Sequence, residues 1–179
     1  MKSSVFLLGL IITLASAAVR CADAAETPIE VDACELMNNT IAYHQKLVRV
    51  DARVARGFED FTLRGKACPD LLTVWLEFGG PEPAKINYCC VGEQQYPPNG
   101  KDPLVIDGIV TSLVRDRRFQ VFDRQTKRLK RNQTMRTVIV GRVFAKQAYE
   151  TGETEDFSGG FGHFGMMSLL VIQQIERVW

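Results

Sequence analysis

Residues 47–54, LVRVDARV, alternate apolar and charged side chains from position 48 onward. Valine or alanine occupies the even positions, and arginine or aspartate occupies positions 49, 51 and 53. Successive side chains of a β-strand point to opposite faces, so this pattern predicts a strand with one face in a core and the other in solvent. The stretch indicates a fold built from half-buried strands.

Six further segments have the composition of strands, with aromatic and β-branched residues between turn-forming residues. We predict strands at residues 58–63, 72–78, 104–113, 118–122, 137–144 and 168–178. In the second of these, Val74, Leu76 and Phe78 share one face, and Trp75 lies on the other. Trp75 would then line either a groove or a second buried layer.

One helix precedes these strands. Asp32 has the residue type of an N-cap, and Glu35 follows three residues later, as in a capping box. We expect the helix to begin after Asp32 and to end near Tyr43. Residues 25–31 are predicted to be an exposed lead-in.

The spacing of these elements favours a mostly β fold. Strands follow one another without the alternating helices of a parallel α/β sheet. We therefore predict an OB-like small β-barrel with one N-terminal α-helix, with a β-sandwich as the alternative. Two irregular stretches interrupt the strands: residues 79–103 hold five of the seven prolines, and residues 151–165 hold five glycines.

The first residues resemble an export signal. Lys2 precedes an apolar core at residues 5–14, and small residues follow. This order is typical of a secretory signal peptide. We predict a signal peptide at residues 1–24 and one domain at residues 25–179, with cleavage after Ala17 as the alternative. The mature protein would be periplasmic or extracellular, with no membrane span.

Cleavage after residue 24 would remove Cys21 and leave four cysteines, which in an exported protein indicate disulfides. Four cysteines allow three connectivities, and spacing does not choose among them. A bridge between Cys34 and Cys68 would join the start of the helix to the loop before the third strand. The candidates are Cys34, Cys68, Cys89 and Cys90.

Several short motifs are together similar to a group of small exported bacterial proteins of unknown function. They are Cys34-Glu35, YHQKLVRV at 43–50, GFE at 57–59, Cys68-Pro69, WLEF at 75–78, GFGHFG at 160–165 and LVIQ at 170–173. The resemblance covers most of the mature chain. It implies an OB-fold-like barrel and an exported location, and it supplies no catalytic residues.

Composition and motifs exclude several classes of protein. With 46% hydrophobic and 24% charged residues, the chain has the balance of a folded domain and not of a disordered one. It has no Walker loop, HExxH, GxSxG or Rossmann glycine fingerprint. We predict no enzymatic activity and no cofactor.

One segment concentrates positive charge in a chain whose formal net charge is +1. Residues 115–136 contain nine basic residues against Asp116 and Asp123. We interpret the segment as a basic hairpin with its tip near residues 126–132, and Phe119 and Phe122 as stacking platforms. The expected partner is an envelope polyanion, either anionic lipid headgroups or a surface glycan; nucleic acid is not expected of an exported protein. The candidate ligand-binding residues are Trp75, His163, Arg128, Lys130 and Arg131.

Two other interpretations stay open. Soft ligands in an exported protein suit Cu(I), and the candidates are His163, Met166 and Met167, with Cys89 and Cys90. An enzyme would most readily use His163 as a base, but neither histidine has a nucleophile motif near it. His44, at the expected helix end, has the position of a structural histidine.

Overall fold

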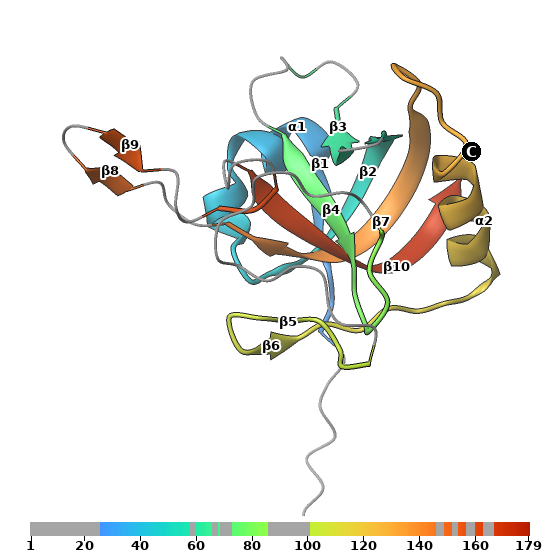
Figure 1. Cartoon of the computed structure of the whole chain (residues 1–179), viewed down its shortest axis with the longest axis horizontal. Coiled ribbons are helices and arrows are strands. Elements are labelled where there is room, and N and C mark those ends of the chain that lie inside the picture. Colours follow the sequence, from blue (N-terminus) through green and yellow to red (C-terminus); the bar gives the residue numbers. More distant parts are fainter. Residues whose placement is uncertain are drawn as a thin grey trace, which may run out of the picture.

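Figure 1 shows the computed structural model, which describes residues 26–57, 60–65, 68, 73–85, 101–145, 149–151, 154–156, 160–162 and 167–179. The predicted signal peptide, residues 1–24, lies outside the described residues. So do four of the candidate site residues, namely Cys89, Cys90, His163 and Met166.

The predicted strand at residues 47–54 is confirmed as part of β2 (Leu47–Arg56). Its even-numbered residues are buried, and Asp51 and Arg53 are exposed. β2 pairs along most of its length with β7 (Met135–Phe144) and, through residues 53–56, with β3 (Phe61–Arg64). Both pairings are antiparallel, so the alternating sequence forms one wall of the core.

The strands close into a barrel. β3 pairs with β4 (Val74–Phe78), β4 pairs in parallel with β10 (Ser168–Val178), and β10 pairs with β7. Because β7 also pairs with β2, the order β2-β3-β4-β10-β7 returns to its start. The mostly β fold class is confirmed as a closed five-stranded barrel, compatible with an OB-like barrel, and the β-sandwich alternative is wrong.

An additional strand, β1 (Ile29–Asp32), pairs in parallel with residues 48–51 of β2. The exposure predicted for residues 25–31 agrees with Ile29 and Glu30, which are exposed, but residues 29–31 form a strand and Val31 is buried. β3 reaches only the second half of β2, so the edge of the first half is open to another strand. β1 occupies that edge and buries Val31 against the core.

The predicted helix begins where expected. Asp32 caps α1 (Ala33–Asn38), and its carboxylate accepts hydrogen bonds from the amides of Cys34 and Glu35. The helix ends early, and a 3₁₀ turn, η1 (Thr40–Tyr43), continues it. The hydroxyl of Tyr43 donates to the Glu35 carboxylate at 2.5 Å, which ties the two pieces together.

Two short hairpins accompany the barrel. The strand predicted at residues 104–113 is instead β5 (Val105–Ile106) and β6 (Ile109–Val110). Asp107 and Gly108 between them have φ of 49° and 77°, the pair of positive angles that a tight hairpin turn requires. The other hairpin consists of β8 (Tyr149–Thr151) and β9 (Thr154–Asp156).

The strand predicted at residues 118–122 is wrong, because this segment lies in helix α2 (Arg117–Thr126). Asp116 caps the helix by accepting from the amide of Phe119 at 2.9 Å. Phe119, Phe122 and Thr126 are buried, at the spacing of one helical face. Two phenylalanines three residues apart can lie on one face of a helix, and a short segment of this composition can also form a strand. The sequence of this segment is therefore compatible with both structures.

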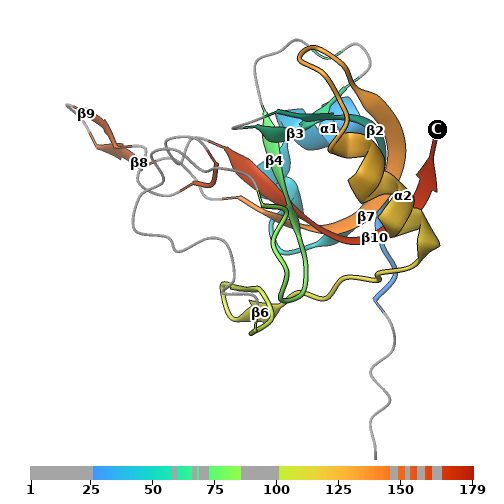
Figure 2. The same ribbon diagram turned by 45° about the vertical axis from the view of Figure 1, so that its right-hand side comes forward.

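Helix α2 packs against β10 and β2 (Figure 2). Its phenylalanines meet the barrel core, where the ring centres of Phe78 and Phe119 lie 5.0 Å apart and those of Phe61 and Phe122 lie 6.3 Å apart. The Phe78–Phe119 pair is edge-on, an arrangement that stabilises beyond the area it buries, and the Phe61–Phe122 pair is tilted. The helix is thus part of the folded core and holds its outer face in a fixed position.

Candidate anion-binding surface

The basic segment of the sequence forms α2 and the turn after it, and not a hairpin. Six of its cationic side chains are exposed, and within the described part of the chain none of them forms an ion pair. They are Arg117, Arg118, Arg124, Arg128, Lys130 and Arg131. By contrast, Lys127 pairs with Asp123 at 2.6 Å and Arg115 pairs with Glu82 at 2.9 Å. We call these six residues the α2 basic surface.

Helical periodicity aligns part of this surface. Arg117 and Arg124 are seven residues apart and therefore lie on one side of α2, about 10 Å apart along its axis. Arg128, Lys130 and Arg131 follow in the turn before β7. The sequence prediction of these three as exposed cations is compatible with their position, and their role in binding stays a prediction.

The proposed stacking role of the two phenylalanines is wrong. Phe119 is 4% exposed and Phe122 is fully buried, because both face the barrel from the inner side of α2. No ligand can stack on them while the helix is in place. The α2 basic surface therefore carries charge without an aromatic ring.

Arg56 fastens α2 to the barrel. Its side chain is 5% exposed, and its guanidinium donates to the Asp123 carboxylate at 3.1 Å and to the Thr126 hydroxyl at 3.2 Å. It also donates to the carbonyl of Ala84 and lies 4.8 Å from the ring centre of Phe61. Sequence analysis missed this residue, although the alternation of β2 already assigns position 56 to the buried face.

A second cationic cluster lies on the outer face of the barrel. Strand register places Arg53 of β2 directly opposite Arg136 of β7 and opposite Arg64 of β3. The Arg136 guanidinium binds both carboxylate oxygens of Asp51, at 3.0 and 2.7 Å. These hydrogen bonds lower the pKa of Asp51 and raise that of Arg136. No sequence motif marks this cluster, because its members meet only through strand pairing.

Trp75 lies in the second buried layer that the sequence allowed for, and not in an open groove. It is 1% exposed. Gly162, with φ of 69°, covers its ring so closely that a Cβ there would come within 2.8 Å of a ring carbon. Met167 packs at the same place and pairs through its backbone with Phe161. Trp75 thus has no exposed face in this structure, and its proposed part in ligand binding stays untested.

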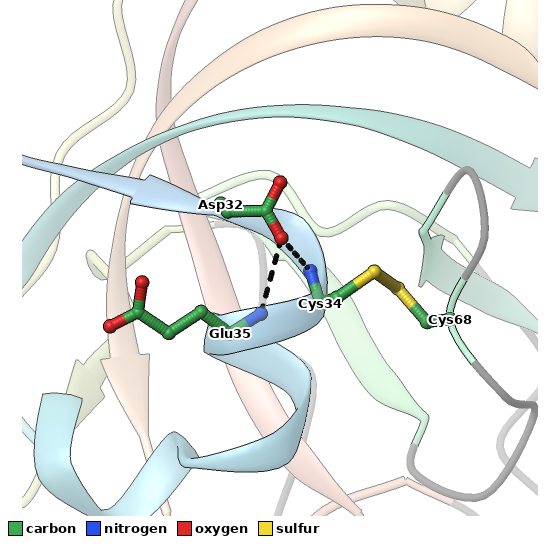
Figure 3. Close-up of a disulfide and its surroundings, with 4 residues drawn as sticks. All are labelled: Asp32, Cys34, Glu35 and Cys68. Atoms are coloured by element: carbon green, nitrogen blue, oxygen red, sulfur yellow. Dashed lines mark hydrogen bonds between the residues drawn. A yellow bond between two sulfur atoms is a disulfide. The ribbon is translucent and has the colours of Figure 1, made fainter.

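One disulfide joins Cys34 at the start of α1 to Cys68, in the segment between β3 and β4 (Figure 3). This is one of the pairings that the sequence left open. Cys89 and Cys90 lie outside the described residues, so their predicted pairing stays a prediction. The bridge ties the N-terminal helix to the segment that follows β3.

His44 has a structural position at the end of η1. Its Nδ1 accepts a hydrogen bond from the amide of Ala145 at 3.1 Å, and its ring lies edge-on to Phe144. Its Nε2 lies 3.9 Å from the Asp107 carboxylate. His44 therefore links η1 to β7 and to the β5–β6 turn.

The described residues do not include the whole of the predicted soft-metal set. Met167 is half-buried, while His163, Met166, Cys89 and Cys90 fall outside. In the described ranges, no three histidine, cysteine or acidic side chains come together as a metal-binding group. The soft-metal hypothesis stays a prediction. Over the same ranges, no helix is long and apolar enough to cross a membrane.

Fold and surface together define a class, a closed five-stranded β-barrel with a basic helix packed on it. Comparisons with family models, with curated proteins and with solved structures found no match for this chain.

Proposed function

We propose that this protein is an exported, non-enzymatic binding module that attaches to polyanions of the cell envelope through the α2 basic surface. The observation that carries the proposal is the set of exposed cations on α2 and its following turn, which have no acidic partner among the described residues. A local concentration of unpaired charge attracts polyanions even when the whole molecule is close to neutral.

The rigidity of α2 supports this function. The Phe119 and Phe122 rings are buried in the barrel core, and Arg56 bonds to Asp123 and Thr126 of the helix. Arg117, Arg118 and Arg124 on this helix have fixed backbone positions, so a polyanion binds this part of the surface without first ordering a loop. Binding would release counterions from the polymer and would therefore weaken steeply as salt concentration rises.

The test compares two variants in which the same number of positive charges is reversed. One variant changes the α2 basic surface, and the other changes residues outside it. We expect the double variant Arg128→Glu/Arg131→Glu to bind polygalacturonate, or vesicles with one quarter phosphatidylglycerol, on the order of tenfold more weakly than wild type at low salt. The control Lys46→Glu/Lys101→Glu has the same net charge and changes residues far from α2 in the chain. We expect it to bind as wild type does.

Titration calorimetry at several salt concentrations gives both the affinity and its salt dependence. Equal affinity of the α2 variant and wild type for both probes would refute the proposal. An equal loss in the α2 variant and the control would also refute it, because total charge and not this surface would then govern binding.

A further inference from the structure

The outer face of the barrel next to α2 brings like charges together. Arg53 lies directly opposite Arg136, and opposite Arg64 on its other side. Like charges at directly opposed positions destabilise a sheet. Asp51 compensates for Arg136, whereas the described contact of Arg53 is with the uncharged hydroxyl of Thr134 at 3.3 Å. Such a face gains stability when an anion binds to it.

An exposed aromatic ring borders this face. Trp179 is 50% exposed, and among the described residues it is the one aromatic side chain of the exposed large hydrophobics. The Arg136 guanidinium lies 4.3 Å from its ring centre, and that of Arg177 lies 5.4 Å away. The Trp179 amide also donates to the Arg136 carbonyl at 3.2 Å. The ring is thus held beside the arginines.

We infer that this face binds an acidic polysaccharide, with Trp179 stacking against a sugar ring and Arg53, Arg136 and Arg177 binding its carboxylate or sulfate groups. The inference deepens the proposed function and rests on its premise that the protein binds polyanions of the cell envelope. The two surfaces are continuous, because the turn that carries Arg131 leads through Thr134 into β7, and Thr134 accepts from Arg53.

The side chains around Trp179 favour a saccharide over a bilayer. A surface that inserts into lipid presents an apolar face. The described ring contacts of Trp179 are instead with the guanidinium groups of Arg136 and Arg177, and Arg136 in turn pairs with Asp51. The other exposed large hydrophobics lie on other segments of the chain. They are Ile29, Ile41, Val105, Val110 and Val114.

The same surroundings favour a saccharide over single-stranded nucleic acid. Proteins that bind single strands stack successive bases on several rings. Phe119 and Phe122 are buried, and in the described part of the chain Trp179 is the one aromatic residue among the exposed large hydrophobics. The carboxylate of Asp51, 45% exposed, would repel closely spaced phosphates. It can accept hydrogen bonds from sugar hydroxyls, which a polymer carrying both hydroxyls and acids provides.

The first part of the test is the affinity for polygalacturonate. We expect Trp179→Ala to bind it roughly tenfold more weakly, the loss typical of removing one stacking ring, and Trp179→Phe to retain most of the affinity. Arg53→Gln should reduce the slope of log affinity against log salt concentration by about 1. Thermal melting shows whether each variant is folded, and wild-type affinity in folded Trp179→Ala would overturn the inference.

The second part is acrylamide quenching of tryptophan fluorescence, since Trp75 is buried and Trp179 is exposed. We expect polygalacturonate to protect wild-type emission from acrylamide. Protection by phosphatidylglycerol vesicles or by oligo-dT, without protection by polygalacturonate, would overturn the inference in favour of that partner.

The further inference and the proposed function can be refuted independently of each other. If Arg128→Glu/Arg131→Glu loses binding while Trp179→Ala binds normally and bound polygalacturonate leaves Trp179 fully quenchable, this inference is refuted and the proposed function stands. If the reverse pattern is found, the α2 basic surface is not the attachment site, and the Trp179 face is.

Discussion

The guanidinium of Arg56 is buried between β2 and α2, where a charge is stable only if its hydrogen bonds are satisfied. Asp123, Thr126 and the Ala84 carbonyl accept from it, and Phe61 and Phe78 flank it. The residue therefore joins three segments that are distant in sequence. Its loss would leave the Ala84 carbonyl and part of the Asp123 carboxylate without their donor.

We expect Arg56→Ala to lower the free energy of unfolding by about 3 to 5 kcal/mol, because breaking a buried pair leaves polar groups uncompensated. Urea denaturation followed by circular dichroism measures the change. Arg53→Ala, an exposed arginine three residues away on the same strand, should cost less than about 1 kcal/mol. Similar losses of unfolding free energy in both variants would contradict the stabilising role of the buried Arg56 contacts.

At the scale of elements, the disulfide and β1 determine how the N-terminal segment is attached. β1 pairs with β2, Asp32 caps α1, and Cys34 then crosses to Cys68 beyond β3. The α1 helix has only six residues and is too short to be stable alone. Its position therefore depends on the covalent bond and on the burial of Leu36 and Met37.

We expect Cys34→Ser/Cys68→Ser to be about 3 to 4 kcal/mol less stable than wild type, the value for a bridge across 34 positions in the chain-entropy model. Denaturant titration with and without reductant measures it. Reduction should destabilise the wild type by breaking the Cys34–Cys68 bridge. In the double variant, reduction has no bridge to break at these positions. A variant as stable as the oxidised wild type would contradict this expectation.

At the scale of the whole molecule, ionised carboxylates on the outer face contribute stability that depends on pH. Arg142 lowers the pKa of Glu26, and Arg136 lowers the pKa of Asp51, in each case chiefly through a hydrogen bond to the carboxylate. A carboxyl group with a lower pKa in the folded than in the unfolded state stabilises the fold above its unfolded pKa. This contribution to stability is lost as pH falls below the unfolded pKa, about 4, and through the lower pKa of the folded state.

We therefore expect wild type to lose stability between about pH 5 and pH 3 more steeply than Asp51→Asn does. Thermal melting over this range, at constant ionic strength, measures the two slopes. The double variant Asp51→Asn/Glu26→Gln should have a still flatter profile. Parallel profiles of wild type and Asp51→Asn would exclude a stabilising role for the Asp51–Arg136 pair.

The sequence predicted the parts of this molecule that depend on local pattern. The alternation at residues 47–54 and the Asp32 cap gave β2 and the start of α1. The pattern failed where a short segment suits two structures, as with the phenylalanines of α2. The cluster of Arg53 and Arg136 could not be predicted, since it exists only through the register of β2 with β7.

The order of strands around the barrel differs from their order along the chain, and this affects how the protein comes to be folded. β10 is inserted between β4 and β7, although both precede it in the sequence. A growing chain that has not yet released residues 168–178 would therefore expose two unpaired strand edges, which are sites of aggregation. Closure of the barrel has to wait for residues 168–178, so the barrel can form only after this segment has become available for pairing.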